Sequence, residues 1–520
     1  MRYVIGIDIG TSSTKAVLFD TDGQQIARCA QKYDLRSPAP GAAEQNPNDI
    51  LNAATQTVAK VVSTSGIDPA QLIGLSFSAA MHTLLLIDEA NQPLTPMYTW
   101  ADNRSDRWAD FVKTHSDARA LYERTGLPAH PMSPLVKLVW LHNEHPELFG
   151  QAARVVAIKE YVLWHWCGEW VIDHSMATTT GLLELRSLQW DTEALNLAGI
   201  DSSQLSTLVP TTYKFPGIKP DYAQKMGISA DTPVIVGASD GVLSNLGVGA
   251  ISSGTAAITI GTSGAVRQVV DRPITESAKQ LFCYALTEDR WVMGGAVNNG
   301  GIALQWSRDR LMPYSIPLEE QHLSNPEPSA STYERLNQMA QTVPAGAEGL
   351  IFHPYLLGER APLWDASARA SFFGLGRHHT QAHLVRAVLE GVLYNLHSVF
   401  TALEKSGGEV TVLRASGGFA RSDLWQQMLA DIFNRKIEIP DVIESSAFGA
   451  AMLALWALGE WDELAPPEER AVPHPLHPSI IQTKRPIPEN VRRYQKILPI
   501  YRELLAAFQT QYEALQKVMD

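Results

Sequence analysis

Apolar and polar positions near the start of the chain predict a β-hairpin. The segment VIGIDIGTSSTKAVLF places Val4, Ile5 and Ile7 in one β-rich run, and a second such run follows the loop at residues 10–13. Runs of this kind, separated by Gly and Ser, are typical of two antiparallel strands. The small loop residues leave backbone N–H groups free to face an anion, which favours a phosphate clamp. An ordinary Thr/Ser-rich turn is the alternative.

The same pattern returns in the second half of the chain. The run AAITIGTSGAVRQVV begins at Ala256, and its core stands 251 positions after the core of the first hairpin. Such a repeat predicts two similar domains, each presenting a phosphate-facing hairpin toward a shared cleft. Asp8 of the first copy corresponds to Thr259 of the second, so a carboxylate able to face a metal ion is expected in one copy only. The matching positions are Ile7, Ile9, Gly10, Thr11 and Ser12 with Ile258, Ile260, Gly261, Thr262 and Ser263.

The rest of the pattern alternates predicted strands with predicted helices. Apolar residues recur at helical spacing after Pro47, up to a stop signal at Gly66, and β-rich runs lie on both sides of this helix. This order is typical of an α/β fold, and we expect two domains, residues 1–247 and 248–520. Further strands are expected at 24–30, 72–78, 83–88, 155–158, 350–354 and 410–415, further helices at 384–403, 422–434 and 489–519, and an exposed loop at 324–331.

Composition narrows the class of protein. The 520 residues are 45% hydrophobic, which is enough for well-formed cores, and their formal net charge of −13 argues against non-specific binding to nucleic acid or to an anionic membrane. Cys29, Cys167 and Cys283 lie far apart, so neither a disulfide framework nor a zinc site is expected. No stretch offers roughly 18 uncharged apolar residues. We expect a cytoplasmic protein without nucleic-acid or membrane partners; a homodimer is left open.

Asp240 is the candidate general base. It follows the apolar run Val234, Ile235 and Val236 and is surrounded by Gly, Ala and Ser. A carboxylate at the end of a buried strand is where α/β folds place reactive groups. The alternative is an Asx-turn or a helix cap, and spacing alone does not decide between the two.

Polar and aromatic residues that suit a polyol gather in a second segment. Trp100, Asp102 and Arg104 fall within five residues, where a ring can face C–H groups while the charged side chains bind hydroxyls. A helix start, with Asp102 or Asn103 as a cap and the charges solvated, explains them equally well. Ser133 and Pro134 predict the cap and first turn of another helix, in which Lys137 is expected to be structural or solvated.

A glycine pair closes the set of candidate features. Gly417 and Gly418 follow the β-rich run that ends near Ala415 and precede a predicted helix. Glycines at such a turn let the backbone approach a flat nucleobase or its ribose, although a plain strand-to-helix turn explains them almost as well.

With these features in place, the chain resembles the FGGY carbohydrate kinases, which have the actin and hexokinase type (ribonuclease H-like) ATPase fold. Two further segments carry the resemblance, MSPLVKLVWLHNE at 132–144 and the stretch from Ala370 to Glu390. The family implies ATP and Mg²⁺ as cofactors, Asp240 as the base, and an N-terminal sugar-binding domain. It also implies the following roles: Asp8 and Asp240 at Mg²⁺; Thr11, Ser12, Ser13, Lys15, Gly261, Thr262, Ser263, Gly417 and Gly418 at ATP; and Met81, His82, Trp100, Asp102, Arg104 and Asp240 at the sugar.

Within the family the chain is most similar to the gluconokinase branch, through His130 to Leu135 and the later Lys159, Glu160 and Tyr161. This similarity implies phosphorylation of D-gluconate to 6-phospho-D-gluconate. Xylulokinases and other pentulose kinases are the alternative, although Thr83 stands where xylulokinases usually have Gly. A more remote alternative is a non-catalytic ATP switch of the actin or chaperone kind. GxxxxGK[ST] is absent from the sequence, so a P-loop kinase is set aside.

Overall fold

The computed structural model describes residues 1–115, 117–312, 330–461 and 478–519. Its contacts divide the chain into two compact units. The first unit contains Met1–Ser253, Val269–Met293 and Glu444–Pro478, and the second contains Gly254–Gln268, Gly294–Ile443 and Ser479–Asp520. The chain therefore passes between the units several times, whereas the sequence pattern predicted one division after residue 247. Most of the predicted loop at 324–331 lies outside the described residues.

A six-stranded sheet forms the centre of the first unit, with the strand order β13-β14-β5-β1-β2-β3. β1 pairs antiparallel with β2 and parallel with β5, so the predicted N-terminal hairpin is confirmed and stands in the middle of the sheet. Both strands of the hairpin are almost entirely buried, which explains their continuous apolar runs. The strands are β1 (Tyr3–Ile9), β2 (Ser13–Asp20), β3 (Gln25–Lys32), β5 (Leu72–Ala79), β13 (Lys214–Phe215) and β14 (Val234–Ser239).

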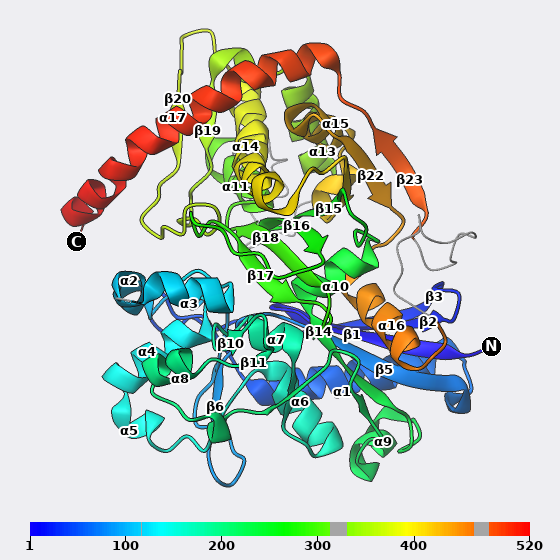
Figure 1. The fold of residues 1–520 in the computed structure, drawn as a ribbon. Helices are drawn as coiled ribbons and strands as arrows, with labels where there is room; N and C mark the ends of the chain where they lie inside the picture. The colour runs from blue at the N-terminus through cyan, green and yellow to red at the C-terminus, as the bar shows by residue number, and fades with distance from the viewer. Residues whose placement is uncertain (116, 313–329, 462–477, 520) are drawn as a thin grey trace. The chain divides into compact units, whose positions relative to one another are not determined.

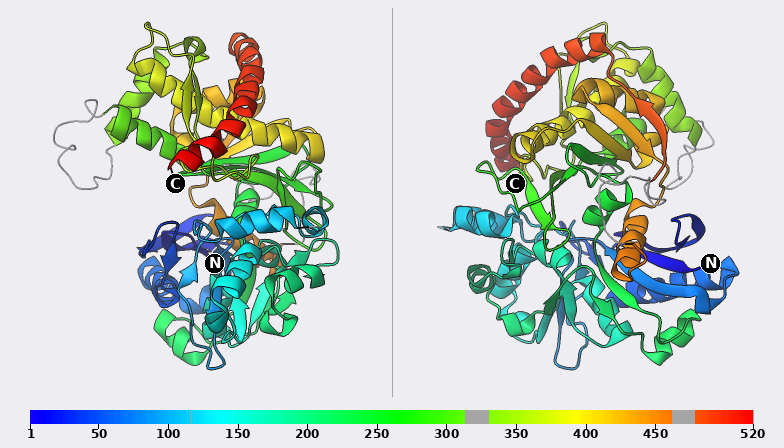
Figure 2. Two further views of the ribbon diagram at one scale, coloured as in Figure 1. Left: turned by 90° about the vertical axis from the view of Figure 1, so that its left-hand side faces the viewer. Right: turned by 45° about the vertical axis from the view of Figure 1, so that its right-hand side comes forward.

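Helices cover both faces of this sheet (Figures 1 and 2). α1 (Pro47–Ser65) has the predicted signals, with Asn46 as a side-chain cap, Pro47 at the first position and Gly66 in the left-handed conformation at its end. α16 (Ser445–Ala457) packs against β1 and against α10 (Asp240–Gly247). The approach is very close, because a Cβ on Gly6 would lie 1.9 Å from the carbonyl oxygen of Ala447. This packing explains why residues 444–478 belong to the first unit.

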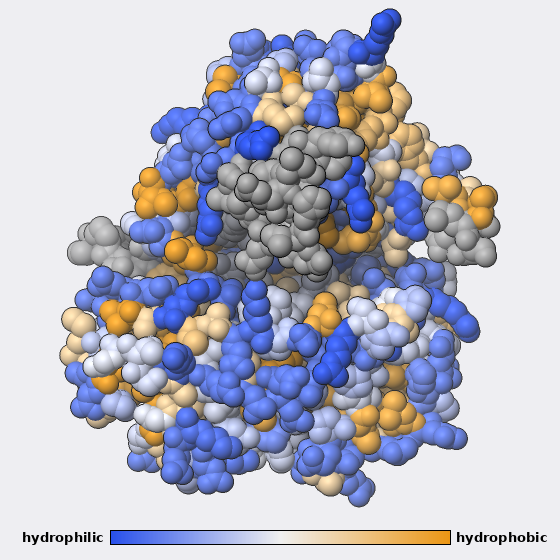
Figure 3. Space-filling model, turned by 180° about the vertical axis from the view of Figure 1, so that it is seen from behind, coloured by the Kyte–Doolittle hydropathy of each residue, from blue (hydrophilic) through white to orange (hydrophobic). Residues whose placement is uncertain are grey.

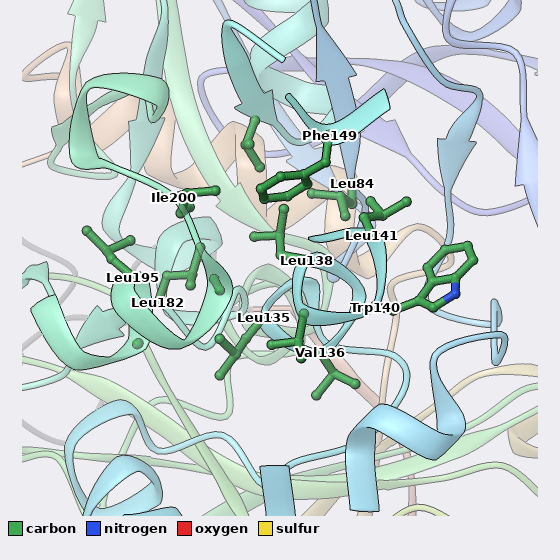
Figure 4. Packing of buried hydrophobic residues seen from close by; sticks show 14 of the residues in the cluster. Leu84, Leu135, Val136, Leu138, Trp140, Leu141, Phe149, Leu182, Leu195 and Ile200 are labelled. Atoms are coloured by element: carbon green, nitrogen blue, oxygen red, sulfur yellow. The ribbon is translucent and has the colours of Figure 1, made fainter. Parts of the chain in front are cut away.

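Short helices and small sheets complete the first unit. These elements share a hydrophobic core that includes leucines of α4 (Pro134–Glu144), together with Trp140 and Phe149 (Figure 4). The remaining helices are α2 (Asp106–Thr114), α3 (Ala118–Thr125), α5 (Pro146–Phe149), α6 (Ile158–Cys167), α7 (His174–Thr178), α8 (Thr192–Ala198) and α9 (Pro220–Met226). Paired short strands are β4 (Glu44–Gln45) with β7 (Met97–Tyr98), β6 (Leu85–Ile87) with β8 (Arg154–Val156), β9 (Val171–Asp173) with β12 (Thr207–Val209), and β10 (Leu183–Glu184) with β11 (Gln189–Trp190).

A seven-stranded sheet has the order β17-β18-β16-β15-β21-β22-β23, and all of it except β17 and the adjoining ends of β16 and β18 lies in the second unit. β15 pairs antiparallel with β16 and parallel with β21, which is the arrangement that β1 has with β2 and β5. The repeat at a spacing of 251 residues is therefore confirmed as a repeat of topology. The strands are β15 (Thr255–Ile260), β16 (Gly264–Val270), β17 (Phe282–Ala285), β18 (Trp291–Val297), β21 (Val412–Ser416), β22 (Lys436–Pro440) and β23 (Ile480–Lys484), with a separate pair, β19 (Ile351–His353) and β20 (Ser371–Phe373).

Long helices pack around this second sheet. α14 (Gln381–Gly407) and α15 (Asp423–Phe433) contact each other, and α17 (Pro488–Met519) runs along the outer side of the unit, where it packs against α15 (Figure 1). All three correspond to predicted helices. The glycine-rich stretch around Gly294 lies in β18, where a Cβ on Gly294 would meet a carbonyl oxygen at 2.3 Å. The remaining helices described in this unit include α11 (Gly301–Trp306) and α13 (Ala330–Gln341).

Hydrophilic residues dominate the surface seen in Figure 3, and hydrophobic ones are scattered among them. Within the described residues, no helix is both long enough and apolar enough to cross a membrane.

Candidate active site

Two side chains hold the loop of the first hairpin from outside. Trp100 Nε1 donates a hydrogen bond of 2.8 Å to Thr11 Oγ1, and Gln45 Nε2 donates one of 2.7 Å to the carbonyl oxygen of Thr11. Ser12 stays exposed at the tip. Because both the carbonyl oxygen and the hydroxyl of Thr11 accept hydrogen bonds, these contacts restrain the shape of the loop. The structure thus brings Trp100 of the predicted sugar set against Thr11 of the predicted phosphate set.

Asp8 is buried beside this loop at the end of β1. Its carboxylate accepts a hydrogen bond from Ser78 Oγ (3.0 Å) and lies 3.7 Å from Lys15 Nζ. Burial raises the pKa of Asp8, and the Lys15 ammonium partly offsets this effect. Lys15 also pairs at 2.8 Å with Glu444. Burial lowers the pKa of Lys15, but the charges of Asp8 and Glu444 outweigh it, so the pKa is raised overall.

Glu444 is the acidic residue that sequence reasoning missed in this unit. It precedes α16 and binds both Lys15 and Arg28, the latter at 2.6 Å. No motif marks it, because only the packing of α16 on β1 brings it to the hairpin. Since Lys15 lies close to two carboxylates, it is the counter-ion of an acidic pair.

Asp240 begins α10 directly after β14, as the sequence predicted for a group at a strand end. It is half-buried, and its Oδ1 accepts the N–H of Gly241 at 2.7 Å. Gly237 makes this placement possible: its φ is +73°, and a Cβ there would lie 1.8 Å from the carbonyl oxygen of Phe77. The pairing of β14 with β5 shifts register next to this glycine. This irregularity interrupts regular pairing at the end of β14, shortly before Asp240.

Ser239, next to Asp240, is tied to a second element. Its hydroxyl lies 3.0 Å from Ser175 Oγ, and its N–H donates to the same atom at 3.2 Å. Ser175 belongs to α7, whose first turn is capped by Asp173. Asp173 forms an ion pair of 2.5 Å with Lys159, and both side chains are fully buried. The strand end that carries Asp240 therefore rests on a helix anchored by a buried ion pair.

His82 stands in a strained conformation in the first unit. Its φ of +61° is uncommon for a residue with a side chain, and strain of this kind is concentrated at functional sites. Nδ1 donates to the carbonyl oxygen of Thr179 at 2.7 Å, and Nε2 faces the hydroxyl of Tyr284 at 3.3 Å. Met81 is half-buried in the same turn. Tyr284 gave no signal in the sequence, because it meets His82 only through the fold.

The guanidinium of Arg104 contacts two carboxylates and two aromatic rings. Its Nη2 lies 2.6 Å from both Glu44 Oε1 and Asp102 Oδ2, and the guanidinium stands over the rings of Tyr98 and Trp140, 5.1 Å from each centroid. The side chain of Asp102 is 1% exposed. These contacts anchor Asp102 and Arg104 in their loop, and their expected contact with the sugar stays a prediction. Asp102 does not cap a helix, since α2 begins at Asp106.

Lys137 is fully buried beneath the loop that precedes α4. Its Nζ donates to the carbonyl oxygens of Pro131 and Met132, at 2.7 Å each. Burial lowers its pKa to about 7, against an opposing effect of Asp102. A neutral amine still has two N–H donors, enough for both carbonyls. Of the two roles that the sequence left open, the structural one is confirmed. Ser133 caps the helix through the N–H of Val136, as predicted.

The second hairpin has a tighter turn than the first. The N–H of Gly261 donates to the carbonyl oxygen of Ser263 (2.9 Å), whereas the equivalent bond in the first hairpin runs from Gly10 to Ser13 (3.0 Å). The loop is also supported from the start of α11, because Gly301 N–H donates to the Gly261 carbonyl at 2.7 Å. A Cβ on Gly300 would lie 2.4 Å from the carbonyl oxygen of Ser263, so the approach requires glycine.

A cavity of about 440 Å³ adjoins this hairpin within the second unit. Gly417 lies behind it with a φ of +101°, where a Cβ would meet the carbonyl oxygen of Ile260 at 2.4 Å. Two polar atoms of lining residues, Asn337 Oδ1 and Trp425 Nε1, are buried without a partner in the described part of the chain. Among the residues lining the cavity are Gly261, Thr262, Tyr333, Gly418 and Phe419.

No group of three or more His, Cys, Asp or Glu side chains suited to a metal ion occurs among the described residues. Mg²⁺ bound to nucleotide phosphates needs only one or two protein carboxylates, because it keeps several waters. Asp8, held by Ser78 and close to Lys15, has the oxygen donors for such an ion.

Comparison with known proteins identifies the family. The model of the N-terminal domain of the FGGY family of carbohydrate kinases matches residues 3–247, and the C-terminal model matches residues 256–458. The chain belongs to the FGGY family. This FGGY chain is 46% identical to the gluconokinase of Bacillus subtilis, over 98% of this chain and 97% of that protein. Its fold matches a gluconate kinase from Lactobacillus acidophilus (TM-score 0.90, 37% identity, 99% of both chains). A ligand-bound xylulose kinase from the same organism matches equally well (TM-score 0.91, 36% identity, 99% and 100% of the two chains).

The resemblance and the actin/hexokinase-type α/β fold expected from the sequence are therefore confirmed. The roles of individual residues follow from geometry and stay predictions. Sequence motifs pointed to both hairpins, Asp240 and the glycine pair. They gave no sign of Glu444, Tyr284 or the cavity residues Asn337 and Trp425, each of which reaches its site through long-range packing.

Proposed function

We propose that this FGGY kinase transfers the γ-phosphoryl group of ATP to the primary hydroxyl of D-gluconate, giving 6-phospho-D-gluconate and ADP. The observation that carries the proposal is the 46% identity to a gluconokinase over nearly the whole of both chains. The His130 to Leu135 segment, which favours the same branch, supports it. In this segment, the carbonyl oxygens of Pro131 and Met132 accept hydrogen bonds from Lys137 Nζ.

In this reaction the second unit receives the nucleotide. The N–H groups of the hairpin at Gly261 face the phosphates, and the cavity beside it takes the base.

The first unit supplies the chemistry at the sugar. Asp240 accepts the proton of the attacking hydroxyl, and its half-buried position leaves the carboxylate accessible. Asp8, with Asp240, would hold Mg²⁺, which when bound neutralises the charge that builds on the phosphoryl oxygens. His82 and Met81 face the sugar, with His82 oriented by Thr179 and Tyr284. Phosphoryl transfer needs little covalent help from the protein, so positioning dominates the rate.

Phosphorylation of xylulose is the second candidate, because a xylulose kinase structure matches the chain as well as the gluconate kinase structure does. We also assign the enzyme to the cytoplasm, an assignment supported by the three cysteines being free.

The test is a coupled assay of ADP formation with gluconate, xylulose, ribulose, glycerol and rhamnulose, with ³¹P NMR of the product. Gluconate should give the highest kcat/KM and a phosphomonoester on its primary carbon. A preference for xylulose would favour the second candidate. ATP turnover that did not depend on any polyol would overturn the kinase assignment and favour a nucleotide switch.

A further inference from the structure

Glu359 is a fully buried carboxylate whose oxygens accept four N–H donors. Oε1 accepts the backbone N–H groups of Asn298 (2.5 Å) and Arg360 (2.8 Å). Oε2 accepts the side-chain amides of Asn395 (2.7 Å) and Asn299 (3.2 Å). Burial raises the pKa of Glu359, and these donors oppose the rise. Because each of these partners donates, the ionised carboxylate is the form that the site satisfies.

These contacts fix the loop between β18 and α11. Asn299 is also buried and holds the facing segment, since its Oδ1 accepts the N–H of Leu357 (3.2 Å) and its Nδ2 donates to the carbonyl oxygen of Gly358 (2.8 Å). The end of this loop and the first turn of α11 support the second hairpin directly. Gly300 and Ile302 each donate a backbone hydrogen bond of 3.1 Å to the carbonyl oxygen of Thr262.

On its other side, Glu359 is connected to the long helices of the second unit. Asn395 lies on α14, and its Oδ1 accepts a weak hydrogen bond from the hydroxyl of Tyr355 at 3.4 Å. That hydroxyl lies 3.0 Å from the hydroxyl of Tyr501 on α17. A continuous series of buried polar contacts thus runs from α17 through Asn395 and Glu359 to the loop that carries the hairpin.

We propose that Glu359 is a positioning residue for the nucleotide site: it holds the Asn298 to Gly301 loop so that the hairpin at Thr262 keeps its phosphate-facing shape. The inference rests on the proposed function, in which this hairpin binds ATP. Glu359 is fully buried and acts only through Asn298, Asn299 and the hairpin.

The chain offers a matched control in Glu390 on α14. This carboxylate is also fully buried and also accepts four hydrogen bonds, from Gly346 N–H, Arg386 Nε, Tyr394 and Tyr494. None of these partners contacts the hairpin loop. Glu359→Ala and Glu390→Ala therefore remove equivalent groups from one unit, and only the first removes support from the nucleotide site.

The experiment measures the Kd for ADP by calorimetry, the KM values for ATP and gluconate, and the melting temperature. Both variants should melt at a lower temperature. Glu359→Ala should raise the Kd for ADP and the KM for ATP roughly ten- to a hundredfold, because buried donors lose their acceptor, and should change the KM for gluconate less than about twofold. Glu390→Ala should leave nucleotide binding within about twofold of wild type.

Conservative variants separate positioning from folding. Glu359→Gln should restore most of the nucleotide affinity. The carbonyl oxygen of the new glutamine can still accept from the N–H groups of Asn298 and Arg360. Its NH₂ group can donate to the Asn395 side chain, once the Asn395 amide turns its oxygen toward it. If Glu359→Ala does not fold, Asn299→Ala removes the next link and should shift the KM for ATP in the same direction.

Three results would contradict the inference. A folded Glu359→Ala variant that binds ADP as wild type does would overturn this inference but not the proposed function. If Glu359→Ala does not fold, the same result for Asn299→Ala has the same consequence. Equal losses of ADP affinity in Glu359→Ala and Glu390→Ala would overturn it as well. Wild-type protein that does not bind ADP would overturn the proposed nucleotide site, and this inference with it.

Discussion

The position of Asp240 depends on Gly237 and on the contact between Ser239 and Ser175. The pairing of β14 shifts register next to Gly237, and the bonds between Ser239 and Ser175 hold the end of this strand. Asp240→Asn keeps the shape of the side chain but cannot accept a proton. We expect kcat to fall by about 10²- to 10⁴-fold, with the Kd for ADP and the KM for gluconate nearly unchanged. Steady-state kinetics and calorimetry check this, and near-normal turnover in the folded variant would remove Asp240 as the base.

Arg104 shows how a residue type that suits a substrate can serve the loop instead. A planar guanidinium suits a substrate carboxylate, but the guanidinium of Arg104 already pairs with Glu44 and Asp102. Arg104→Met should therefore lower stability by about 1–3 kcal/mol and reduce kcat/KM for gluconate and for a neutral sugar by the same factor. The exposed Arg107→Met is the control. A loss confined to gluconate would show that Arg104 contacts the carboxylate after all.

Lys137 makes stability depend on pH in a defined direction. Burial lowers its pKa in the folded state from 10.5 to about 7, so between these values the unfolded chain binds more protons. The free energy of unfolding therefore gains a contribution that rises with pH above 7, on the order of 1 kcal/mol per pH unit. Lys137→Met lacks this contribution.

The measurement compares melting temperatures of wild type and Lys137→Met at pH 7, 8 and 9. The melting temperature of wild type, relative to that of Lys137→Met, should rise by roughly 2–4 °C per pH unit. Relative to Lys60→Met, which changes an exposed position of α1, it should not rise. A constant difference for Lys137→Met would mean that the buried amine keeps its proton throughout this range.

At the scale of elements, the repeat of the two hairpins was predictable because β-branched runs and small loops leave a clear local pattern. The one-residue difference between their turns was not, since it depends on which carbonyl Gly261 reaches. Helices with complete cap signals were also predicted well, as at α1 and α4. Residues 173–181 are rich in Ser and Thr and carry no helical periodicity, yet they include the short helix α7, which is capped by Asp173 of the buried ion pair.

The second hairpin gives the prediction that belongs to this scale. Thr262→Glu places a carboxylate on the loop proposed to face the ATP phosphates. Repulsion should raise the KM for ATP about tenfold or more and leave the KM for gluconate nearly unchanged. Kinetics with each substrate varied in turn measures both values. Unchanged ATP binding in Thr262→Glu would mean that this loop does not face the phosphates.

For the whole molecule, the sequence was enough for the family and the two-domain class, but the division into units follows packing. Residues 444–478 join the first unit because the glycines of β1, α10 and α16 let backbones approach closely. Only the fold shows which side chains from distant parts of the sequence meet. Glu444 with Lys15 and Asn395 with Glu359 are such pairs, and local patterns carry no information about them.

The net charge of −13 leads to a prediction about the substrate. An anionic protein repels gluconate at long range, and salt screens charges farther apart than about 8 Å at physiological ionic strength. At saturating ATP, kcat/KM for gluconate should therefore rise roughly twofold, relative to a neutral sugar, between about 0.02 M and about 0.2 M KCl. The neutral sugar controls for salt effects on folding and on ATP. A relative fall would instead mean that a local positive field attracts gluconate, and His82 and His130 would be the first residues to replace.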